Sequence, residues 1–423
     1  MKEILLARPG KRACFTLCVS ILSVIVLGYA LLFAVSLLPQ EHLRKNILQA
    51  DSRGYFSENY PQYSWLRPLY NRLDMYTECM GLGIALNMKP DAKTLLEMPA
   101  FGECSSLHNI IAANNFDAAP HAYMRFIHGY QIVLKSMYTV FSLETVRTIM
   151  AGTSLLLLLF LYSALQYRID TRHAAVVVFS FFLTASPNMF FTVTHATAFW
   201  VVLTAALAAT LGRRICPLCF FGIVGALDAF FNFLIMGSLS LALPLLCCTL
   251  VKWAEGESPG RIAATAFWGG IGWSIGYVLP WLLKWLMLFL AFAPTKAVLF
   301  GITLEHYPVR DLAMIATALL RNFLSANWPY IMLVIVVCAL RRRRMALTTP
   351  PGLWAACLPG LIPLFWIGML PGHSGIKHSR FIHLILWPFL AACLLLLLAF
   401  SVEGKNPEGP SDSALPRRDF EDI

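Results

Sequence analysis

Long apolar runs flanked by clusters of Lys and Arg limit this chain to folds embedded in a membrane. A helix needs about 20 apolar residues to cross the hydrocarbon core of a bilayer, and several runs here reach that length. Basic residues mark the cytoplasmic ends of such spans, so their positions predict an orientation. Three clusters adjoin apolar runs: Arg341–Arg344, Arg213–Arg214, and the group of Lys2, Arg8, Lys11 and Arg12. In this orientation the polar residues capable of chemistry collect on the extracytoplasmic face.

The composition excludes a water-soluble globule and argues against nucleic acid as a partner. The 423 residues are 58% hydrophobic and 13% charged, whereas ordinary domains contain about 25% charged residues. A net charge of +10 would suggest nucleic-acid binding in a soluble protein. Here the basic residues lie mainly at the ends of apolar spans, where they act as topology signals. We therefore expect membrane lipids, and no nucleic acid, as partners.

The apolar runs predict an all-α polytopic membrane protein with about ten transmembrane helices. Residues 15–38 are too long for the apolar part of a signal peptide and lack a cleavage site, which indicates a signal anchor. With both termini in the cytoplasm, every cytoplasmic segment is basic, and the two shortest external turns contain no Lys or Arg. The predicted spans begin near residues 15, 148, 174, 196, 215, 235, 263, 325, 352 and 383.

We expect one integrated membrane domain with a long extracytoplasmic first loop. Residues 1–145 contain the anchor helix and this loop, and residues 146–401 form the helical bundle. A second external loop covers 284–326, and the polar tail 402–423 is typical of disorder. Near the end of the first loop, the apolar spacing of Tyr123–Val140 predicts an interfacial helix that leads into the second span.

Two acids in the first loop are the strongest candidates for chemistry. Asp74 and Glu78 are four residues apart, so a helix would place them on one face, about 6 Å apart along its axis. Such a pair could take a proton from a hydroxyl nucleophile, or hold a divalent cation such as Mg²⁺ or Mn²⁺. The alternative is a solvated carboxylate pair with Arg72 as a surface partner. Spacing alone favours the solvated carboxylate pair.

A cationic motif follows in the same loop. Arg125, His128 and Tyr130 lie within six residues, and an Arg fork matches the oxygens of an anionic lipid headgroup. The same residues could instead anchor an interfacial helix by extending their polar ends to the membrane surface. Composition does not distinguish headgroup binding from anchoring of an interfacial helix.

The short loop before the last span also contains cations, which runs against the topology signal. Because external loops of this length normally lack Lys and Arg, a bound phosphate is the favoured explanation. No firm metal-ligand spacing is present, so we assign no metal site. The candidate phosphate-binding residues in this loop are His373, Lys377, His378 and Arg380.

Polar residues inside or beside the predicted spans form a further group. Asp228 and Asn232 lie one turn apart within the fifth predicted span, and a carboxylate there is expected to face a cavity or a partner. Structural and functional roles are equally supported for this pair. We interpret His195 as a satisfied polar residue at a membrane boundary and Lys284 as an interfacial anchor.

The cysteines do not form a disulfide framework. Cys79 and Cys104 both lie in the first external loop and could pair in an oxidising compartment, although spacing alone leaves this open. Cys216 and Cys219 form a C-x-x-C sequence beside Arg213–Arg214. Without a second pair or a βαβ pattern, this sequence indicates reduced thiols rather than a redox or zinc site.

The layout resembles the GT-C class of membrane glycosyltransferases, and more narrowly a largely uncharacterised family of bacterial membrane proteins related to them. In that family pattern Asp occupies the positions of Glu78 and Asn232, so the carboxylate is kept at the first position and lost at the second. Four stretches carry the resemblance: Leu73–Glu78, Arg125–Gln131, Gly225–Leu245 and His373–Arg380.

The resemblance implies a hexosyl- or pentosyltransferase of the bacterial cytoplasmic (inner) membrane. Such an enzyme moves a sugar from a polyprenyl-phosphate donor to a cell-envelope glycan or lipid on the external face. It implies Asp74 as the base, supported by Glu78, with the cationic residues holding the lipid phosphate. The alternatives are a transporter or flippase for lipid-linked envelope precursors, and a non-enzymatic membrane partner of envelope biogenesis.

Overall fold

The part of the chain that the structure describes is built from helices. The computed structural model describes residues 10–61, 73–116, 118–124, 126–184, 190–232, 236–292, 351–369 and 385–402. Within these ranges there is no strand, only an isolated antiparallel bridge between Ala100 and His121. In chain order the helices are α2 (Lys11–Ser36), α3 (Gln40–Ser52), α4 (Met75–Asn87), α5 (Ala92–Glu97), α6 (Cys104–Ala112), α7 (Gln131–Val140), α8 (Leu143–Arg168), α9 (Thr171–Thr184), α10 (Val193–Leu211), α11 (Pro217–Phe231), α12 (Gly237–Ala254), α13 (Pro259–Phe292), α17 (Pro351–Cys357), the 3₁₀ helix η2 (Leu358–Leu361), α18 (Ile362–Met369) and α19 (Trp387–Val402).

Five of the described helices are long and apolar enough to cross a membrane, namely α2, α8, α10, α12 and α13. Shorter apolar helices lie at four other predicted spans, within α9, α11, the segment Pro351–Ile367 and α19. The span expected near residue 325 lies outside the described residues. An all-α membrane protein is therefore confirmed, whereas the count of ten spans stays a prediction.

The spanning helices divide into central and peripheral ones. In the most apolar window of α12, 83% of the residues are buried, and in α10 the share is 72%. The corresponding share in α2 is only 28%, and its outer face exposes large side chains such as Phe15 and Val26. Exposing an apolar face of this length to water is unfavourable, so its exposure is explained by contact with lipid.

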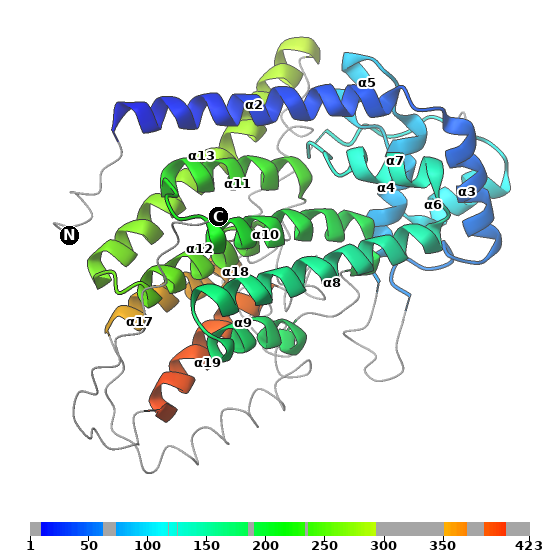
Figure 1. The fold of residues 1–423 in the computed structure, drawn as a ribbon. Coiled ribbons are helices and arrows are strands. Elements are labelled where there is room, and N and C mark those ends of the chain that lie inside the picture. Colours follow the sequence, from blue (N-terminus) through cyan, green and yellow to red (C-terminus); the bar gives the residue numbers. More distant parts are fainter. Residues whose placement is uncertain are drawn as a thin grey trace, which may run out of the picture.

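The first loop folds into a layer of short helices at one end of the bundle. Figure 1 shows α3 to α7 gathered around the neighbouring ends of α2, α8 and α10. Asn46 of α3 donates to the carbonyl of Tyr138 in α7 at 2.7 Å. Buried Lys135 of α7 donates to the carbonyls of Ser36 and Met88, each at 3.3 Å. These bonds join the loop helices to one another and to the end of α2.

One predicted boundary is wrong. The interfacial helix expected over Tyr123–Val140 begins only at Gln131, because the preceding residues turn and make contacts with other elements. The second external loop over 284–326 stays a prediction, and α13 continues past Lys284 to Phe292. Lys284 is 1% exposed, and its ammonium group donates to the carbonyl of Phe126. It is therefore a buried contact to the first loop rather than a headgroup anchor.

Glycines allow α11 and α13 to pack backbone against backbone. A Cβ atom added to Gly276 would lie 1.9 Å from the carbonyl oxygen of Gly222, and one added to Gly272 would lie 2.1 Å from that of Leu218. Gly225 meets the carbonyl of Trp273 in the same way, at 2.3 Å. Small residues at such spacing are typical of close helix pairs in membranes, where packing drives association.

This contact gives a prediction with a matched control on the same helix. Gly276→Ala should lower the free energy of unfolding by about 2 kcal/mol, because the added methyl group collides with a rigid backbone. Gly270→Ala should leave it unchanged or slightly raised, since no atom lies within 4 Å of the added carbon and Ala favours helix. Thermal midpoints of the purified proteins in detergent measure both. Equal midpoints for the two variants would contradict the close packing.

Candidate functional site

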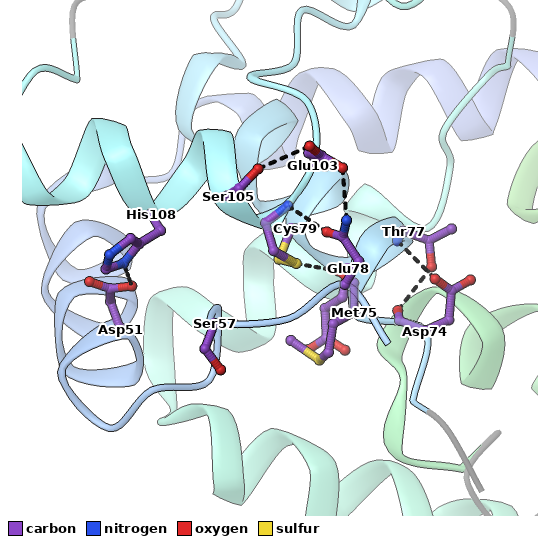
Figure 2. The surroundings of a disulfide bond; sticks show 12 residues. Asp51, Ser57, Asp74, Met75, Thr77, Glu78, Cys79, Glu103, Ser105 and His108 are labelled. Carbon is purple, nitrogen blue, oxygen red and sulfur yellow. Dashed lines mark hydrogen bonds and ion pairs between the residues drawn. A yellow bond between two sulfur atoms is a disulfide. The ribbon is translucent and has the colours of Figure 1, made fainter. Parts of the chain in front are cut away.

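The sequence Asp74-Met75-Tyr76-Thr77 starts α4 with a side-chain cap. Asp74 is the N-cap residue, and its carboxylate accepts the backbone N–H of Thr77 at 3.1 Å. A carboxylate in this position satisfies one of the free amides of the first turn and interacts favourably with the positive end of the helix. Figure 2 shows Asp74 and Thr77 together at this helix start. The local sequence therefore fixes where the Asp74 carboxylate lies.

Asp74 also meets a histidine of the transmembrane bundle. Its Oδ2 atom lies 3.3 Å from Nε2 of His195, in the first turn of α10. Beside this contact the hydroxyls of Thr77 and Thr194 lie 3.2 Å apart. Asp74 and His195 are 2% and 4% exposed, so the pair is almost fully enclosed. The contact joins the first loop directly to a central helix of the bundle.

The surroundings keep Asp74 ionised. Burial alone raises the pKa of this carboxyl, but the hydrogen bond and charge of His195, together with the Thr77 amide, lower it below the usual value. Opposite charge and hydrogen bonds to the charged form are the general causes of such a shift. At neutral pH the site therefore contains a buried carboxylate against an imidazole ring.

Glu78 has a different set of partners. The hydroxyl of Tyr138 in α7 donates to its Oε1 atom, and Arg147 Nη2 of α8 lies 3.7 Å from Oε2. Burial, and next the charge of Glu78, raise the pKa of Tyr138 well above its ordinary value, so the phenol keeps its proton and acts as donor. Glu78 is fully buried. It thus fastens α4 to α7 and α8.

Asp74 and Glu78 have different partners, so they do not act as one carboxylate pair. Asp74 interacts with α10, whereas Glu78 is neutralised by Arg147 and bonded by Tyr138. Across the described ranges, no group of three or more His, Cys, Asp and Glu side chains is arranged to hold a metal ion. The hypothesis that the acids share a divalent cation has no donor set within those ranges. The hypothesis of a solvated surface pair is wrong, since both carboxylates are buried.

A disulfide anchors the same helix, as the first-loop cysteines suggested. Cys79 of α4 is bonded to Cys104 at the start of α6, with the two Cα atoms 5.1 Å apart. The amide of Cys104 donates to Asn59 at 3.0 Å, and Asn59 donates to Glu103 at 2.7 Å. Because Cys79 follows Glu78 directly, this crosslink restricts the movement of the acidic turn.

The motif around His128 is buried rather than presented to a headgroup. The two ring nitrogens of His128 lie 3.2 Å from the carbonyl of Tyr123 and 3.2 Å from the hydroxyl of Tyr130. Burial, then the nearby charge of Lys284, lower the pKa of His128 well below its ordinary value. The ring is neutral at pH 7 and adds no positive charge to a phosphate site.

Several candidate residues lie outside the described residues. These are Arg125 of the first loop and the four residues of the loop before the last span, His373, Lys377, His378 and Arg380. Whether they approach Asp74 and together bind a phosphate stays a prediction.

Asp228 and Asn232 lie at the end of α11 that meets the first loop. Asn232 donates to Oδ1 of Asp228 at 3.0 Å, and the Asp228 side chain is fully buried. The carbonyl of Phe230 accepts the amide of Gly129 at 2.8 Å. A side chain at Gly129 would collide with Phe230, which explains the glycine in this motif. Asp228 is therefore within one helical turn of the first loop.

Sequence reasoning missed three residues of this site, namely His195, Tyr138 and Arg147. His195 was noticed but interpreted as a polar boundary residue, and the other two were not singled out. Their partners lie in distant segments of the chain, so no local spacing indicates the pairs. The sequence did indicate that such partners must exist, because a carboxylate buried in an apolar protein is costly in free energy unless it is paired. It did not indicate which residues they are.

Comparison with known proteins supplies no relative. No family model, no curated protein and no solved structure matches this chain.

The assignment of Glu78 to structure gives a stability prediction. Arg147→Met should lower the free energy of unfolding by about 3 kcal/mol, because it leaves the buried Glu78 carboxylate without its counter-charge. Adding Glu78→Gln to this variant should restore part of the loss, since the unpaired charge is then gone. Thermal or denaturant unfolding in detergent measures both. Additive losses in the double variant would show that the two side chains do not interact.

Buried Lys135 predicts a pH dependence. Burial lowers the pKa of its ammonium group to about 8, whereas an unfolded chain holds this proton up to about pH 10.4. Between these values the unfolded state binds more protons, so rising pH removes a cost of folding. The stability of the native protein relative to Lys135→Met should therefore increase from pH 8 to pH 10 and stay constant below pH 8. A constant difference over the whole range would refute the shift.

Proposed function

We propose that this chain is a membrane glycosyltransferase of GT-C type. It transfers a sugar from a polyprenyl-phosphate donor to a cell-envelope glycan or lipid on the extracytoplasmic face. The observation that carries the proposal is the buried Asp74–His195 pair, formed where the first loop meets the bundle. An ionised carboxylate against an imidazole is a common base for removing a proton from a hydroxyl group.

The proposed reaction uses this pair as the base. The acceptor hydroxyl oxygen attacks the anomeric carbon of the sugar, and the bond from that carbon to the lipid phosphate oxygen breaks. The hydroxyl proton passes to the Asp74–His195 pair, where the carboxylate stabilises the charged imidazole. The lipid phosphate leaves with the bonding electrons, and Arg125, Lys377 and Arg380 stabilise its charge. Glu78 has a positioning role, because it holds α4 in place.

The cysteines support an extracytoplasmic position for the site. Disulfides persist in oxidising compartments, and the Cys79–Cys104 bond lies one residue from Glu78. On the proposed cytoplasmic side, the sulfur atoms of Cys216 and Cys219 lie 3.5 Å apart and remain thiols beside Arg213–Arg214. This difference agrees with the orientation predicted from the basic residues.

Transport of lipid-linked precursors would instead use Asp228, Asn232 and His195 along a pathway. A transport path needs access to these residues from both sides of the membrane. The contact of Phe230 with Gly129 lies beside them and connects this end of α11 to the first loop. That position favours a site at one face over a path through the bundle.

The test compares two acids that have the same local role. Asp91 caps α5 by accepting the amide of Thr94 at 2.8 Å, in the same Asp-x-x-Thr pattern as Asp74, but it is exposed. In cells lacking the native gene, Asp74→Asn should reduce the glycan product at least about 100-fold, the usual cost of losing a catalytic base. Asp91→Asn at equal expression should restore the native glycans.

Mass spectrometry of extracted envelope glycans and lipids gives the readout. His195→Gln should behave like Asp74→Asn, because it removes the other half of the base. Native glycans in Asp74→Asn cells, alongside a loss in the deletion strain, would remove Asp74 from the mechanism. A deletion strain with unchanged glycans and glycolipids would overturn the transferase proposal itself.

A further inference from the structure

Four aromatic side chains follow one another along a single side of α13. Trp273, Tyr277, Trp281 and Trp285 are spaced by four residues, which places them on one face of the helix. Successive ring centroids are 4.6, 6.2 and 5.8 Å apart. We call these residues the aromatic row. The rings of Trp273 and Tyr277 are stacked, whereas Tyr277 and Trp281 are tilted at 43° and Trp281 and Trp285 meet edge-on at 81°. The row is therefore a continuous series of ring contacts along the helix.

The aromatic row faces the interior of the protein. Trp273 donates its indole N–H to Ser240 of α12 at 3.0 Å, and the ring of Trp366 in α18 meets Tyr277 edge-on at 6.0 Å. At the other end, Trp281 contacts the ring of Phe126 in the first loop at 5.3 Å. Trp285 is only partly buried. The row therefore runs from the centre of the bundle to the first loop.

Three buried polar atoms beside this row have no hydrogen-bond partner in the described structure. They are the Tyr277 hydroxyl, the Trp281 indole nitrogen and the Oδ2 atom of Asp228. Their side chains are 8%, 6% and 0% exposed. A Cβ atom added to Gly225, one turn before Asp228 on α11, would lie 2.9 Å from the backbone nitrogen of Tyr277, so the close packing of α11 on α13 brings Asp228 and Tyr277 near each other. Because an unpaired polar atom costs free energy when buried, a group of them indicates a missing ligand or solvent.

We propose that the aromatic row and Asp228 bind the sugar ring of the lipid-linked donor. This inference rests on the proposed function and adds the place where the sugar is recognised. A pyranose or furanose ring has apolar C–H faces and a rim of hydroxyl groups. The indole and phenol rings pack against the faces, the Asp228 carboxylate accepts from ring hydroxyls, and the Tyr277 and Trp281 groups donate to them.

The chemistry of the row favours a sugar over a lipid tail. An isoprenoid chain packs on aromatic rings, but it has no donors or acceptors and would leave all three polar atoms unpaired. A phosphate is also a poor fit to the whole set, because it has no apolar face to pack on the rings. A ligand with both apolar faces and hydroxyl groups satisfies the whole set. Buried water could satisfy the polar atoms alone, and the experiment below separates that outcome.

The position of the row agrees with a donor held beside Asp74. Trp281 contacts the ring of Phe126 in the first loop, and Lys284, one turn further along α13, donates to the carbonyl of Phe126. The end of α11 that holds Asp228 also meets the first loop through the bond from Gly129 to Phe230. The sugar subsite and the proposed base therefore belong to the same end of the bundle.

Binding of two defined lipids tests the proposal with the purified full-length protein in nanodiscs. The probes are a polyprenyl phosphate and the same lipid carrying a hexose or a pentose, and native mass spectrometry measures their affinities. The native protein should bind one of the glycosylated lipids about tenfold or more tightly than the bare phosphate, since hydrogen bonds to a charged group have that strength. Asp228→Asn should abolish this preference and leave binding of the bare lipid unchanged.

Trp281→Phe supplies a second variant, because it removes the indole N–H and keeps an aromatic ring. It should weaken the preference severalfold, whereas Trp268→Phe, on the same helix but outside the row, should keep it. Asp74→Asn should also keep the preference for the glycosylated lipid. Equal affinity of the native protein for glycosylated and bare lipid, or a preference that survives in both Asp228→Asn and Trp281→Phe, would overturn the sugar subsite and indicate buried water.

These outcomes are distinct from failure of the proposed function. If the subsite is wrong but the transferase proposal is right, Asp74→Asn cells still lose the glycan while the lipid preference does not depend on Asp228. If the native protein binds neither lipid and deletion leaves the glycans unchanged, both proposals fail together. Thermal midpoints of all variants, compared with the native protein, exclude a loss of folding as the cause.

Discussion

The burial of two carboxylates at the junction of the first loop and the bundle determines how this end of the protein is built. A buried charge is strongly unfavourable unless it is paired and hydrogen-bonded, so each acid requires partners beyond those that the short helix α4 supplies. Asp74 obtains them from α10 and Glu78 from α7 and α8. The requirement thus draws four helices together, and the Cys79–Cys104 bond adds α6 to the same assembly.

The same requirement gives the two acids different chemical roles. Glu78 lies opposite Arg147 and a phenol that keeps its proton, an arrangement that compensates the charge and holds it in place. Asp74 instead faces the imidazole ring of His195. Spacing of four residues made the two acids look like one unit. Their environments, rather than their separation, decide which of them is suited to proton transfer.

Features set by neighbouring residues could be predicted from the sequence, and features set by distant contacts could not. The apolar runs predicted the helical membrane protein. The spacing in the first loop identified the acids and the cysteines as candidates, but it left the disulfide open and favoured solvated carboxylates. The partners His195 and Arg147 come from helices far along the chain, where no periodic pattern identifies them. Lys284 was misplaced for the same reason, because an isolated cation among tryptophans looks like a headgroup anchor until its contact with Phe126 is known.

The short length of α11 connects the membrane fold to the proposed chemistry. Its 15 residues extend about 22 Å, whereas the hydrocarbon core of a bilayer is about 30 Å thick. The first loop contacts the end of this short helix, where the amide of Gly129 donates to the carbonyl of Phe230. Asp228, in the last turn of α11, is therefore next to the first loop. In the proposed orientation a lipid-linked substrate reaches this position from the bilayer, whereas a soluble sugar would first have to leave water.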